Sequence, residues 1–235
     1  MISKKLQRAR DFEKKYIPYV AEELPKFHVT GGIGWINDPN GFAPYHGEYH
    51  LFYQYHPYDV KWGPMHWGHV KTRDFIRWER LPAALAPDAD YDKDGCFSGG
   101  AVEMPDGRHL LMYTGVRNVR RKNGKIDSFQ TQCIAIGDGV NYEKYEANPV
   151  IRTEDIPEGG SVHDFRDPKI WREDGMYYMV VGNRTPDTSG SILYYRSEDA
   201  IHWEFLNKLA SCHNQYGKMW ECPDFFDMDG QQVML

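Results

Sequence analysis

The sequence contains an internal repeat of four similar stretches. In each, small or polar residues lead into a turn with glycine at its apex, and a run rich in Tyr, Leu, Val and Met follows. The four are INDPNGFAPYHGEYHLFYQY, CFSGGAVEMPDGRHLLMYTG, FRDPKIWREDGMYYMVVG and ECPDFFDMDGQQVML. Their apical glycines, Gly47, Gly107, Gly175 and Gly230, lie 60, 68 and 55 residues apart. A period of this size indicates an array of similar structural units.

A second recurring element completes each unit. It reads HWGHVKTRDFIRWERL, QCIAIGDGVNYEKYE and ILYYRSEDAIHWEF, with an Asp four residues before an aromatic residue: Asp74 before Trp78, Asp138 before Tyr142 and Asp199 before Trp203. Alternating, aromatic-rich runs of this length predict strands, so each unit holds about four short strands. Four-stranded units at this period indicate an all-β protein, a β-propeller, with a β-sandwich of short strands as the alternative. The recurrence of whole units favours the propeller.

The repeat also predicts the limits of the domain. Residues 1–26 begin with a charged segment that has Leu6, Ala9, Phe12 and Tyr16 at helical spacing, so we expect a helical lead before the propeller at 27–235. The fourth unit reaches barely two strands at QQVML. About three and a quarter blades cannot close a ring, and an open sheet edge promotes aggregation. We therefore expect the chain to be part of a longer protein.

Composition excludes several classes of function. The formal net charge of −6 argues against nucleic-acid binding, and no apolar run approaches the ~20 residues of a membrane span. The N-terminus lacks the apolar core of a signal peptide. The four cysteines form no C-x-x-C pair, so reduced thiols in a cytoplasmic protein are expected. The histidines lack the spacing of metal ligands, and no metal is predicted.

Polar residues occupy one position in successive units. Asp38, Ser98, Arg166 and Glu221 each lie nine residues before an apical glycine, and Asp167 lies eight before the third. The first strands of propeller blades line the central axis, so these side chains are expected to converge there. Asp38 stands in DPNG, which alone would predict an ordinary turn. A turn would not require acids at matching positions in several units.

Two carboxylates across a pocket, one ionised and one protonated, can hydrolyse a glycosidic bond. Asp167 follows Arg166, whose charge is expected to keep this acid ionised and suited to binding sugar hydroxyls. Glu221 lies in MWECPDFF, where apolar neighbours are expected to raise its pKa and to suit it to acid/base catalysis.

Several side chains are candidates for sugar binding. Gln54, Trp62 and Trp67 lie in the loop-like segments QYHP and KWGPMHWGH, and we expect them to reach the pocket together with His66 and His69. The alternative for most aromatic residues is a place in the core. The basic stretch RNVRRKNGK, residues 117–125, is either a solvated loop, which we favour, or a site for a substrate phosphate.

These motifs resemble those of glycoside hydrolase family 32, the group of invertases, sucrose-6-phosphate hydrolases and fructanases. WINDPNG, QYHP, WGPMHWGH, CFSGGAV, FRDP and WECPDFF follow in the order of that family over roughly residues 27–235. The sequence departs from the usual pattern at Ile36, His56 and Gly100, and none of these changes removes an acid.

The resemblance implies a five-bladed propeller, of which about three blades and the start of the fourth are present, and a C-terminal β-sandwich that is absent from this chain. It implies a retaining reaction on β-fructofuranosides, with Asp38 as nucleophile, Glu221 as general acid/base and Asp167 stabilising the transition state. It places Asn37, Gln54, Trp62, Phe97, Ser98 and Arg166 in the subsite for fructose. No cofactor is implied.

The residues of the MWECPDFF motif resemble those of bacterial intracellular members of the family, which act on sucrose or sucrose 6-phosphate. A short fructan is a further candidate substrate. A fructosyltransferase with the same three acids is one alternative. A non-catalytic sugar-binding propeller is another, and the presence of all three acids argues against it.

Overall fold

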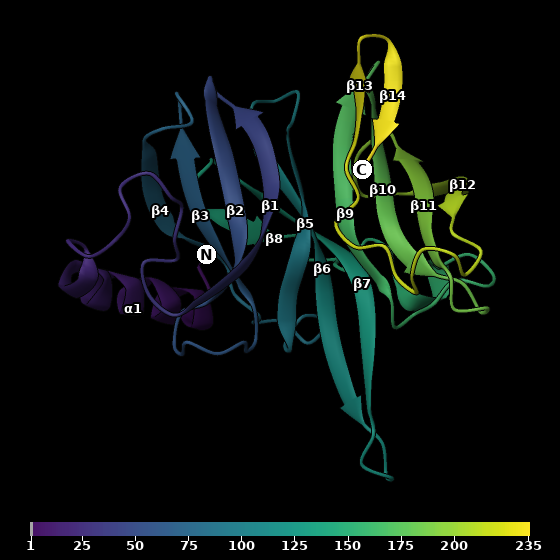
Figure 1. The fold of residues 1–235 in the computed structure, drawn as a ribbon, viewed down its shortest axis with the longest axis horizontal. Coiled ribbons are helices and arrows are strands. Elements are labelled where there is room, and N and C mark those ends of the chain that lie inside the picture. Colours follow the sequence, from purple (N-terminus) through teal and green to yellow (C-terminus); the bar gives the residue numbers. More distant parts are fainter. Residues whose placement is uncertain (1) are drawn as a thin grey trace.

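Each sequence repeat forms one antiparallel sheet in the computed structural model, which describes residues 2–235 (Figure 1). The first sheet contains β1 (Trp35–Tyr45), β2 (Glu48–His56), β3 (His66–Thr72) and β4 (Trp78–Leu85). The second contains β5 (Gly95–Glu103), β6 (His109–Arg120), β7 (Ile126–Gly137) and β8 (Tyr142–Lys144). The third contains β9 (Phe165–Glu173), β10 (Met176–Arg184), β11 (Gly190–Ser197) and β12 (Glu204–Ser211). A hairpin of β13 (Phe225–Met228) and β14 (Gln231–Met234) follows.

The apical glycines close the first hairpin of each unit. All four have positive φ angles, between 77° and 86°. In three of the hairpins the preceding residue is also left-handed: His46, Asp174 and Asp229. Two consecutive left-handed residues are the mark of a type I′ turn, whose twist matches that of the flanking strands. The repeated glycine is therefore a requirement of backbone geometry.

The repeated aspartates form the turn between the third and fourth strands. Oδ1 of Asp74, Asp138 and Asp199 each accepts two backbone N–H bonds, from the second and third residues that follow, at 2.7–2.9 Å. A short acid that binds its own downstream backbone in this way defines an Asx turn. These three acids shape turns, whereas the acids nine residues before the glycines do not.

The sheets pack face to face, with a core on each side of the second sheet. Leu111 and Tyr113 of β6 belong to the cluster shared with the first sheet, whereas Leu110 and Met112 belong to the cluster shared with the third. All four are completely buried. Because side chains alternate across a strand, β6 supplies both cores at once. A sheet buried on both faces between two similar sheets is a propeller blade, and the sandwich alternative is excluded.

A helix, α1 (Lys4–Val20), covers the outer strand of the first sheet, as the sequence predicts (Figure 1). The Ser3 side chain caps it by accepting the N–H of Leu6. Leu6 and Ala9 pack with Ala83 and Ala86, and the carboxylate of Glu13 accepts the N–H of Ala83. No helix within residues 2–235 is long and apolar enough to cross a bilayer.

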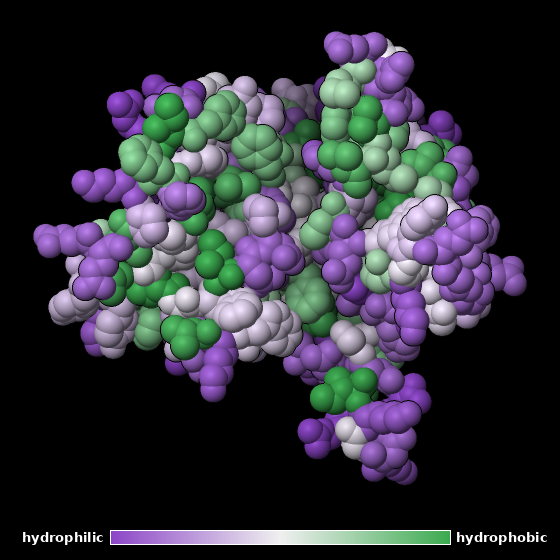
Figure 2. Space-filling model, in the orientation of Figure 1, coloured by the Kyte–Doolittle hydropathy of each residue, from purple (hydrophilic) through white to green (hydrophobic). Residues whose placement is uncertain are grey.

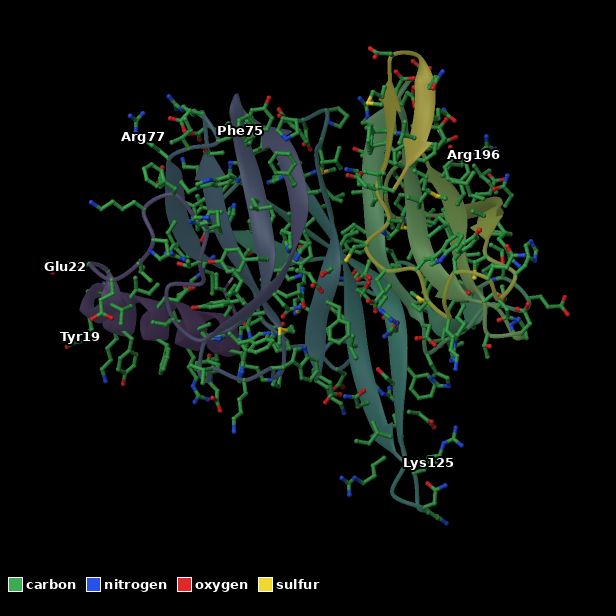
Figure 3. All side chains as sticks on the ribbon, in the orientation of Figure 1. Tyr19, Glu22, Phe75, Arg77, Lys125 and Arg196 are labelled. Atoms are coloured by element: carbon green, nitrogen blue, oxygen red, sulfur yellow. The ribbon has the colours of Figure 1, made fainter. Side chains whose placement is uncertain are left out.

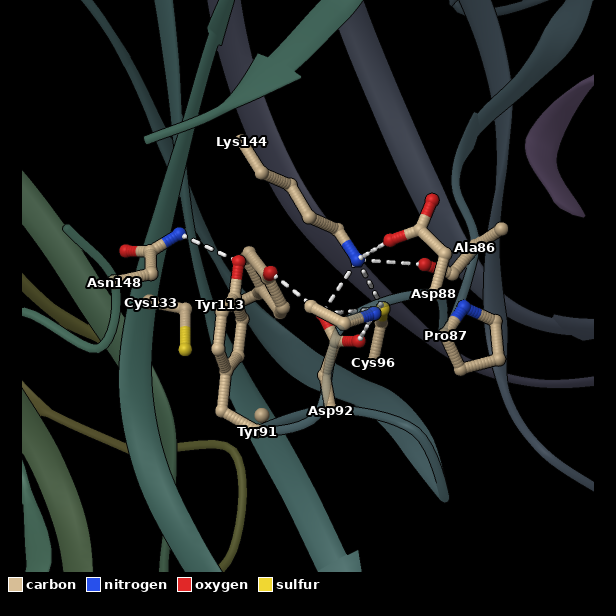
Figure 4. A network of polar contacts seen from close by, with 12 residues as sticks. Ala86, Pro87, Asp88, Tyr91, Asp92, Cys96, Tyr113, Cys133, Lys144 and Asn148 are labelled. Atoms are coloured by element: carbon tan, nitrogen blue, oxygen red, sulfur yellow. Dashed lines mark hydrogen bonds and ion pairs between the residues drawn. The ribbon is translucent and has the colours of Figure 1, made fainter. Parts of the chain in front are cut away.

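A buried polar network joins the first two sheets (Figure 4). The ammonium group of Lys144 donates to Ala86 O at 2.7 Å and pairs with Asp88 and Asp92. The Tyr113 hydroxyl donates to Asp92 Oδ2 at 2.8 Å, and the side chain of Asp92 is completely buried. Burial opposes the charge on Lys144, but the nearby acids outweigh it and raise its pKa.

The basic stretch 117–125 forms the far end of a long hairpin. β6 and β7 pair through Arg120 and Ile126, and the hairpin projects from the rest of the molecule (Figure 1). Lys125 lies near its tip, and that end is mostly hydrophilic, with a small hydrophobic patch (Figures 2 and 3). Arg121 pairs with Asp127. The predicted loop is thus mostly the ends of two paired strands, with exposed cations.

Candidate active site

One pocket collects nine of the ten residues that the sequence predicts for the site. It lies where β1, β5 and β9, the first strands of the three sheets, begin. Asn37 and Asp38 come from β1, Gln54 from β2, Trp62 from the following loop, Phe97 and Ser98 from β5, Arg166 and Asp167 from β9, and Glu221 from the segment before β13. The residues nine before each apical glycine therefore meet at one place.

Asp38 stands in a bulge of β1. Ile36 pairs with Tyr55 and Pro39 with Tyr53, so two residues of β1, Asn37 and Asp38, oppose Gln54 alone. A bulge bends the strand and changes the direction of its side chains. Asp38 is exposed to solvent in the pocket. The DPNG segment thus belongs to a bulged strand and is not a tight hairpin turn.

Asn37 is held in place by its neighbour in sequence. The indole Nε1 of Trp35 donates to Asn37 Oδ1 at 2.7 Å.

Further along the motif, Gly41 has φ 57°, and a Cβ there would lie 2.7 Å from the Phe52 ring. Only glycine fits this position, because a side chain would meet both backbone strain and a steric clash. The last residue of the motif therefore keeps β1 close to β2.

Asp167 is buried and left-handed. It has φ 64° and lies in a second bulge, since Arg166 pairs with Gly182 and Lys169 with Val180. Its Oδ2 accepts the N–H of Cys222 at 3.1 Å. Burial raises the pKa of Asp167 to about 6, and the Cys222 bond and the charge of Arg166 oppose this only in part. The expectation that Arg166 would dominate the pKa of Asp167 is therefore wrong, although an acid with a pKa of about 6 is still mostly ionised at pH 7, as predicted.

Arg166 links the acids of the pocket. Its Nη2 lies 2.5 Å from Glu221 Oε1, its Nη1 lies 3.0 Å from Asp164 Oδ1, and its Nε lies 4.0 Å from Asp167 Oδ2. The Glu221 side chain is 61% exposed. The apolar setting expected for Glu221 is therefore wrong, because this carboxylate faces an arginine and solvent. Sequence reasoning also missed Asp164, although it stands two residues before the arginine.

The segment that carries Glu221 packs closely on the third sheet. A Cβ on Gly182 of β10 would lie 2.3 Å from Trp220 O, and one on Gly190 of β11 would lie 2.8 Å from the Trp220 ring. These two glycines leave the space that Trp220 fills. Close backbone approach of this kind is a common use of glycine in strands.

The two predicted tryptophans have different places. Trp62 is 56% exposed and lies edge-on to Phe97, with ring centroids 6.2 Å apart. Trp67 is completely buried and does not line the pocket; its Nε1 donates to Phe97 O at 3.1 Å. The prediction of Trp67 as a sugar-binding residue therefore does not fit its place, and Trp67 supports Phe97 from behind. His66 and His69 are also buried outside this pocket.

The floor of the pocket is polar and firmly bonded. Gln54, 2% exposed, donates from Nε2 to Cys96 O at 3.1 Å, and Ser98 is 3% exposed. Asp38 and Glu221 are thus two accessible carboxylates over a buried floor, with a third acid, Asp167, beside them. Paired carboxylates of this kind provide a nucleophile and a proton donor. Within residues 2–235 no group of three His, Cys, Asp or Glu side chains is arranged to hold a metal ion.

Comparison with known proteins identifies the family. The profile of the glycosyl hydrolases family 32 N-terminal domain matches residues 28–235. The chain belongs to glycosyl hydrolase family 32. Its sheets are the first three blades, with the start of the fourth, of the five-bladed propeller of this family, which confirms the predicted fold.

Family 32 relatives match along almost the whole chain. A sucrose-6-phosphate hydrolase of Zymomonas mobilis is 43% identical over 245 residues, which cover 99% of this chain and 46% of the relative. A raffinose invertase of Escherichia coli is 42% identical over a match that spans 86% of this chain and 41% of the relative. The chain spans less than half the length of these curated relatives.

Solved structures of family 32 enzymes superpose well. A substituted Bombyx mori β-fructofuranosidase in complex with sucrose has a TM-score of 0.84 and 41% identity, covering 97% of this chain and 47% of its own. A sucrose-6-phosphate hydrolase of Lactobacillus gasseri has a TM-score of 0.78 and 31% identity, covering 100% and 45%.

Proposed function

We propose that the protein hydrolyses terminal β-D-fructofuranosides, with sucrose or sucrose 6-phosphate as substrate, and that the configuration at the anomeric carbon is retained. The observation that carries this proposal is the pocket in which Asp38, Asp167 and Glu221 meet, formed by the first three blades and the segment before β13. Membership of family 32 and the names of the relatives, sucrose-6-phosphate hydrolase and raffinose invertase, support it.

In the first step, the Asp38 carboxylate attacks the anomeric carbon of fructose while Glu221 protonates the leaving oxygen of glucose. The products are a covalent fructosyl ester on Asp38 and free glucose or its phosphate. This step needs a protonated Glu221, whose Oε1 lies 2.5 Å from Arg166 Nη2 in the structure. We propose that the bound substrate separates this pair, so that Glu221 contacts the glycosidic oxygen.

In the second step, Glu221 takes a proton from water, which attacks the ester and releases fructose and the Asp38 carboxylate. One group thus serves as acid and then as base, as retention requires. Asp167 accepts hydrogen bonds from fructose hydroxyls and favours the positive charge that develops on the ring. Because its pKa is about 6, Asp167 is mostly ionised at pH 7 and able to do this.

Retention makes a geometric prediction. Retaining glycosidases hold their two carboxyl groups about 5–5.5 Å apart, and inverting ones about 6.5–9.5 Å. Asp38 and Glu221 are expected to adopt the shorter separation when a substrate is bound. A complex with an unreactive fructoside would measure this distance directly.

The proposal is tested with full-length protein by measuring the release of glucose and fructose from sucrose and from sucrose 6-phosphate. Activity on at least one of them, with a loss of about 10⁴-fold or more in Asp38→Ala, is expected. Full activity of this variant would refute the role of Asp38. Fructosylated sugars in place of free fructose would indicate a transferase, and no reaction of the wild type would indicate a binding protein.

The phosphate of the substrate is tested separately on the β6–β7 hairpin. Arg117, Arg120 and Arg121 replaced together by Ala would weaken turnover of sucrose 6-phosphate more than that of sucrose if the hairpin binds phosphate. Equal losses of activity on both substrates would show that the hairpin does not bind the phosphate and that these exposed cations form a solvated loop, as the sequence favours.

A further inference from the structure

Three buried polar side chains of the second blade reach across to the first residues of the third. They are Thr114 of β6 and Gln130 and Gln132 of β7, with exposed fractions of 0%, 4% and 0%. None of them lines the pocket of the acids. Buried polar groups need partners, and these find theirs in the backbone of β9.

The bonds of Thr114 and Gln132 form a directed chain. Asp167 N donates to Thr114 Oγ1 at 3.1 Å, and the Thr114 hydroxyl donates to Gln132 Oε1 at 3.2 Å. Gln132 Nε2 then donates to Phe165 O at 2.8 Å. The single hydroxyl proton of Thr114 is taken up by Gln132, so its oxygen is left as an acceptor for Asp167. The amide of Gln132 is oriented from both ends.

Gln130 completes the contacts from the opposite side. Its Oε1 accepts the N–H of Phe165 at 2.8 Å and also Nη1 of Arg166 at 3.4 Å. The N–H and C=O of Phe165 and the N–H of Asp167 are therefore all bound by side chains of the neighbouring blade.

Asp167 needs such support, because its backbone is unfavourable. A non-glycine residue with φ 64° costs free energy, and it persists only where the surroundings hold it. The bulge between Arg166 and Lys169 also removes a regular ladder partner from this residue. Thr114 supplies the acceptor for the freed N–H. If that N–H lost its acceptor, the residue would be free to return to the extended conformation and turn its carboxylate.

We propose that Thr114, oriented by Gln132, is a positioning residue that holds the bulge at Asp167 and so aims the Asp167 carboxylate at the substrate. This inference rests on the proposed role of Asp167 in fructoside hydrolysis. The competing explanation is that these hydrogen bonds only satisfy buried polar groups at the interface between two blades. In that case, removing the bonds would lower stability and leave the rate of the reaction unchanged.

The test compares Thr114→Val, which keeps the shape and removes the acceptor, with Thr114→Ser, which keeps the hydroxyl. In full-length protein we expect kcat on sucrose to fall about 10- to 100-fold in Thr114→Val, because a small misplacement of a substrate-positioning group costs this much. We expect Thr114→Ser to stay within about three-fold of the wild type, since it restores the same bond.

Thr72→Val is a matched control. Thr72 is 4% exposed, and its Oγ1 also accepts backbone N–H bonds, from Asp74 and Phe75, at 3.2 and 2.9 Å in the first blade. It should lower the melting temperature without lowering kcat. A Thr114→Val variant that behaves in the same way, with kcat unchanged, would overturn the proposal.

Two further measurements cover the other outcomes. If Thr114→Val does not fold, Gln132→Met removes the hydrogen bond that orients Thr114. A smaller fall in kcat is then expected, and an unchanged kcat would overturn the proposal.

If the wild type does not hydrolyse sucrose, the proposed function fails, but carbon-13 titration of the Asp167 carboxyl still tests the positioning. We expect Thr114→Val to move this pKa away from about 6, because a turned carboxylate changes both its burial and its bond to the N–H of Cys222. An unchanged titration would count against the proposal.

Discussion

Asp167→Asn is expected to stabilise the fold at neutral pH while it removes activity. The pKa of Asp167 is about 6 in the folded protein, against 3.8 for the unperturbed group. A difference of about 2 units corresponds to about 3 kcal/mol at 1.36 kcal/mol per unit. This is the free energy by which the ionised carboxylate weakens the fold. An amide of the same shape avoids the charge and can still accept the N–H of Cys222.

Because the pKa of Asp167 is higher in the folded than in the unfolded state, the wild type should lose stability as the pH rises between the two pKa values. Below about pH 4 the carboxyl is protonated in both the folded and the unfolded state, so wild type and variant should be equally stable. Between pH 4 and pH 6 only the unfolded state loses its proton, and the wild type becomes less stable as the pH rises. Above pH 6 the full difference of about 3 kcal/mol is reached and stays constant.

The assay is urea unfolding of full-length wild type and Asp167→Asn at intervals from pH 4 to pH 8, read as the difference in unfolding free energy. Asp74→Asn is the control, because Asp74 is a solvent-exposed turn residue whose backbone bonds lower its pKa. That variant should lose stability at neutral pH. A stability difference for Asp167→Asn that does not grow between pH 4 and pH 6 would refute the reasoning about burial.

Two further predictions concern the buried network between the first two blades and the segment that carries Glu221. Lys144→Met should lower the unfolding free energy by about 3 kcal/mol, because it leaves the completely buried Asp92 without its cation; denaturant unfolding measures it. Gly182→Ala should lower kcat by roughly ten-fold or more, because its Cβ would lie 2.3 Å from Trp220 O and displace the segment that carries Glu221; steady-state kinetics measure it.

Each of these has a control in the same chain. Lys71 pairs with Glu48 and Glu79 at the surface of the first blade, so Lys71→Met should cost about 1 kcal/mol or less. Ser191→Ala in the third blade removes a buried hydroxyl that has no partner, so it should leave kcat unchanged and not lower stability. Equal effects of Lys144→Met and Lys71→Met, or of Gly182→Ala and Ser191→Ala, would contradict the two predictions.

The repeat allowed the blades and the meeting of the acids to be predicted. A fixed distance from the turn glycine to the start of a strand places equivalent residues at the same end of each sheet, and Asp38, Asp167 and Glu221 do line one pocket. The second element of the repeat was equally informative. Asp74 and its equivalents recur because each side chain binds the backbone N–H groups that follow it and so forms a turn.

The environment of the acids could not be predicted, because it depends on contacts between blades. Apolar neighbours in sequence suggested that the Glu221 carboxyl would be shielded from water, but its side chain faces Arg166 and solvent. Arg166 suggested an easily ionised Asp167, but the bulge buries that carboxyl. The loop-like sequence KWGPMHWGH contains both Trp62 and Trp67, but Trp67 lies in β3, and tertiary packing buries it and leaves Trp62 exposed.

The central claim is that Asp38 is the nucleophile, and the most direct measurement of it is mass spectrometry of a trapped intermediate. Full-length Glu221→Gln protein, incubated with a fructofuranoside that has a reactive leaving group and then quenched in acid, should carry one fructosyl group on the peptide that contains Asp38. The same peptide from Asp38→Asn protein should be unmodified. A fructosyl group on another carboxylate would contradict the account.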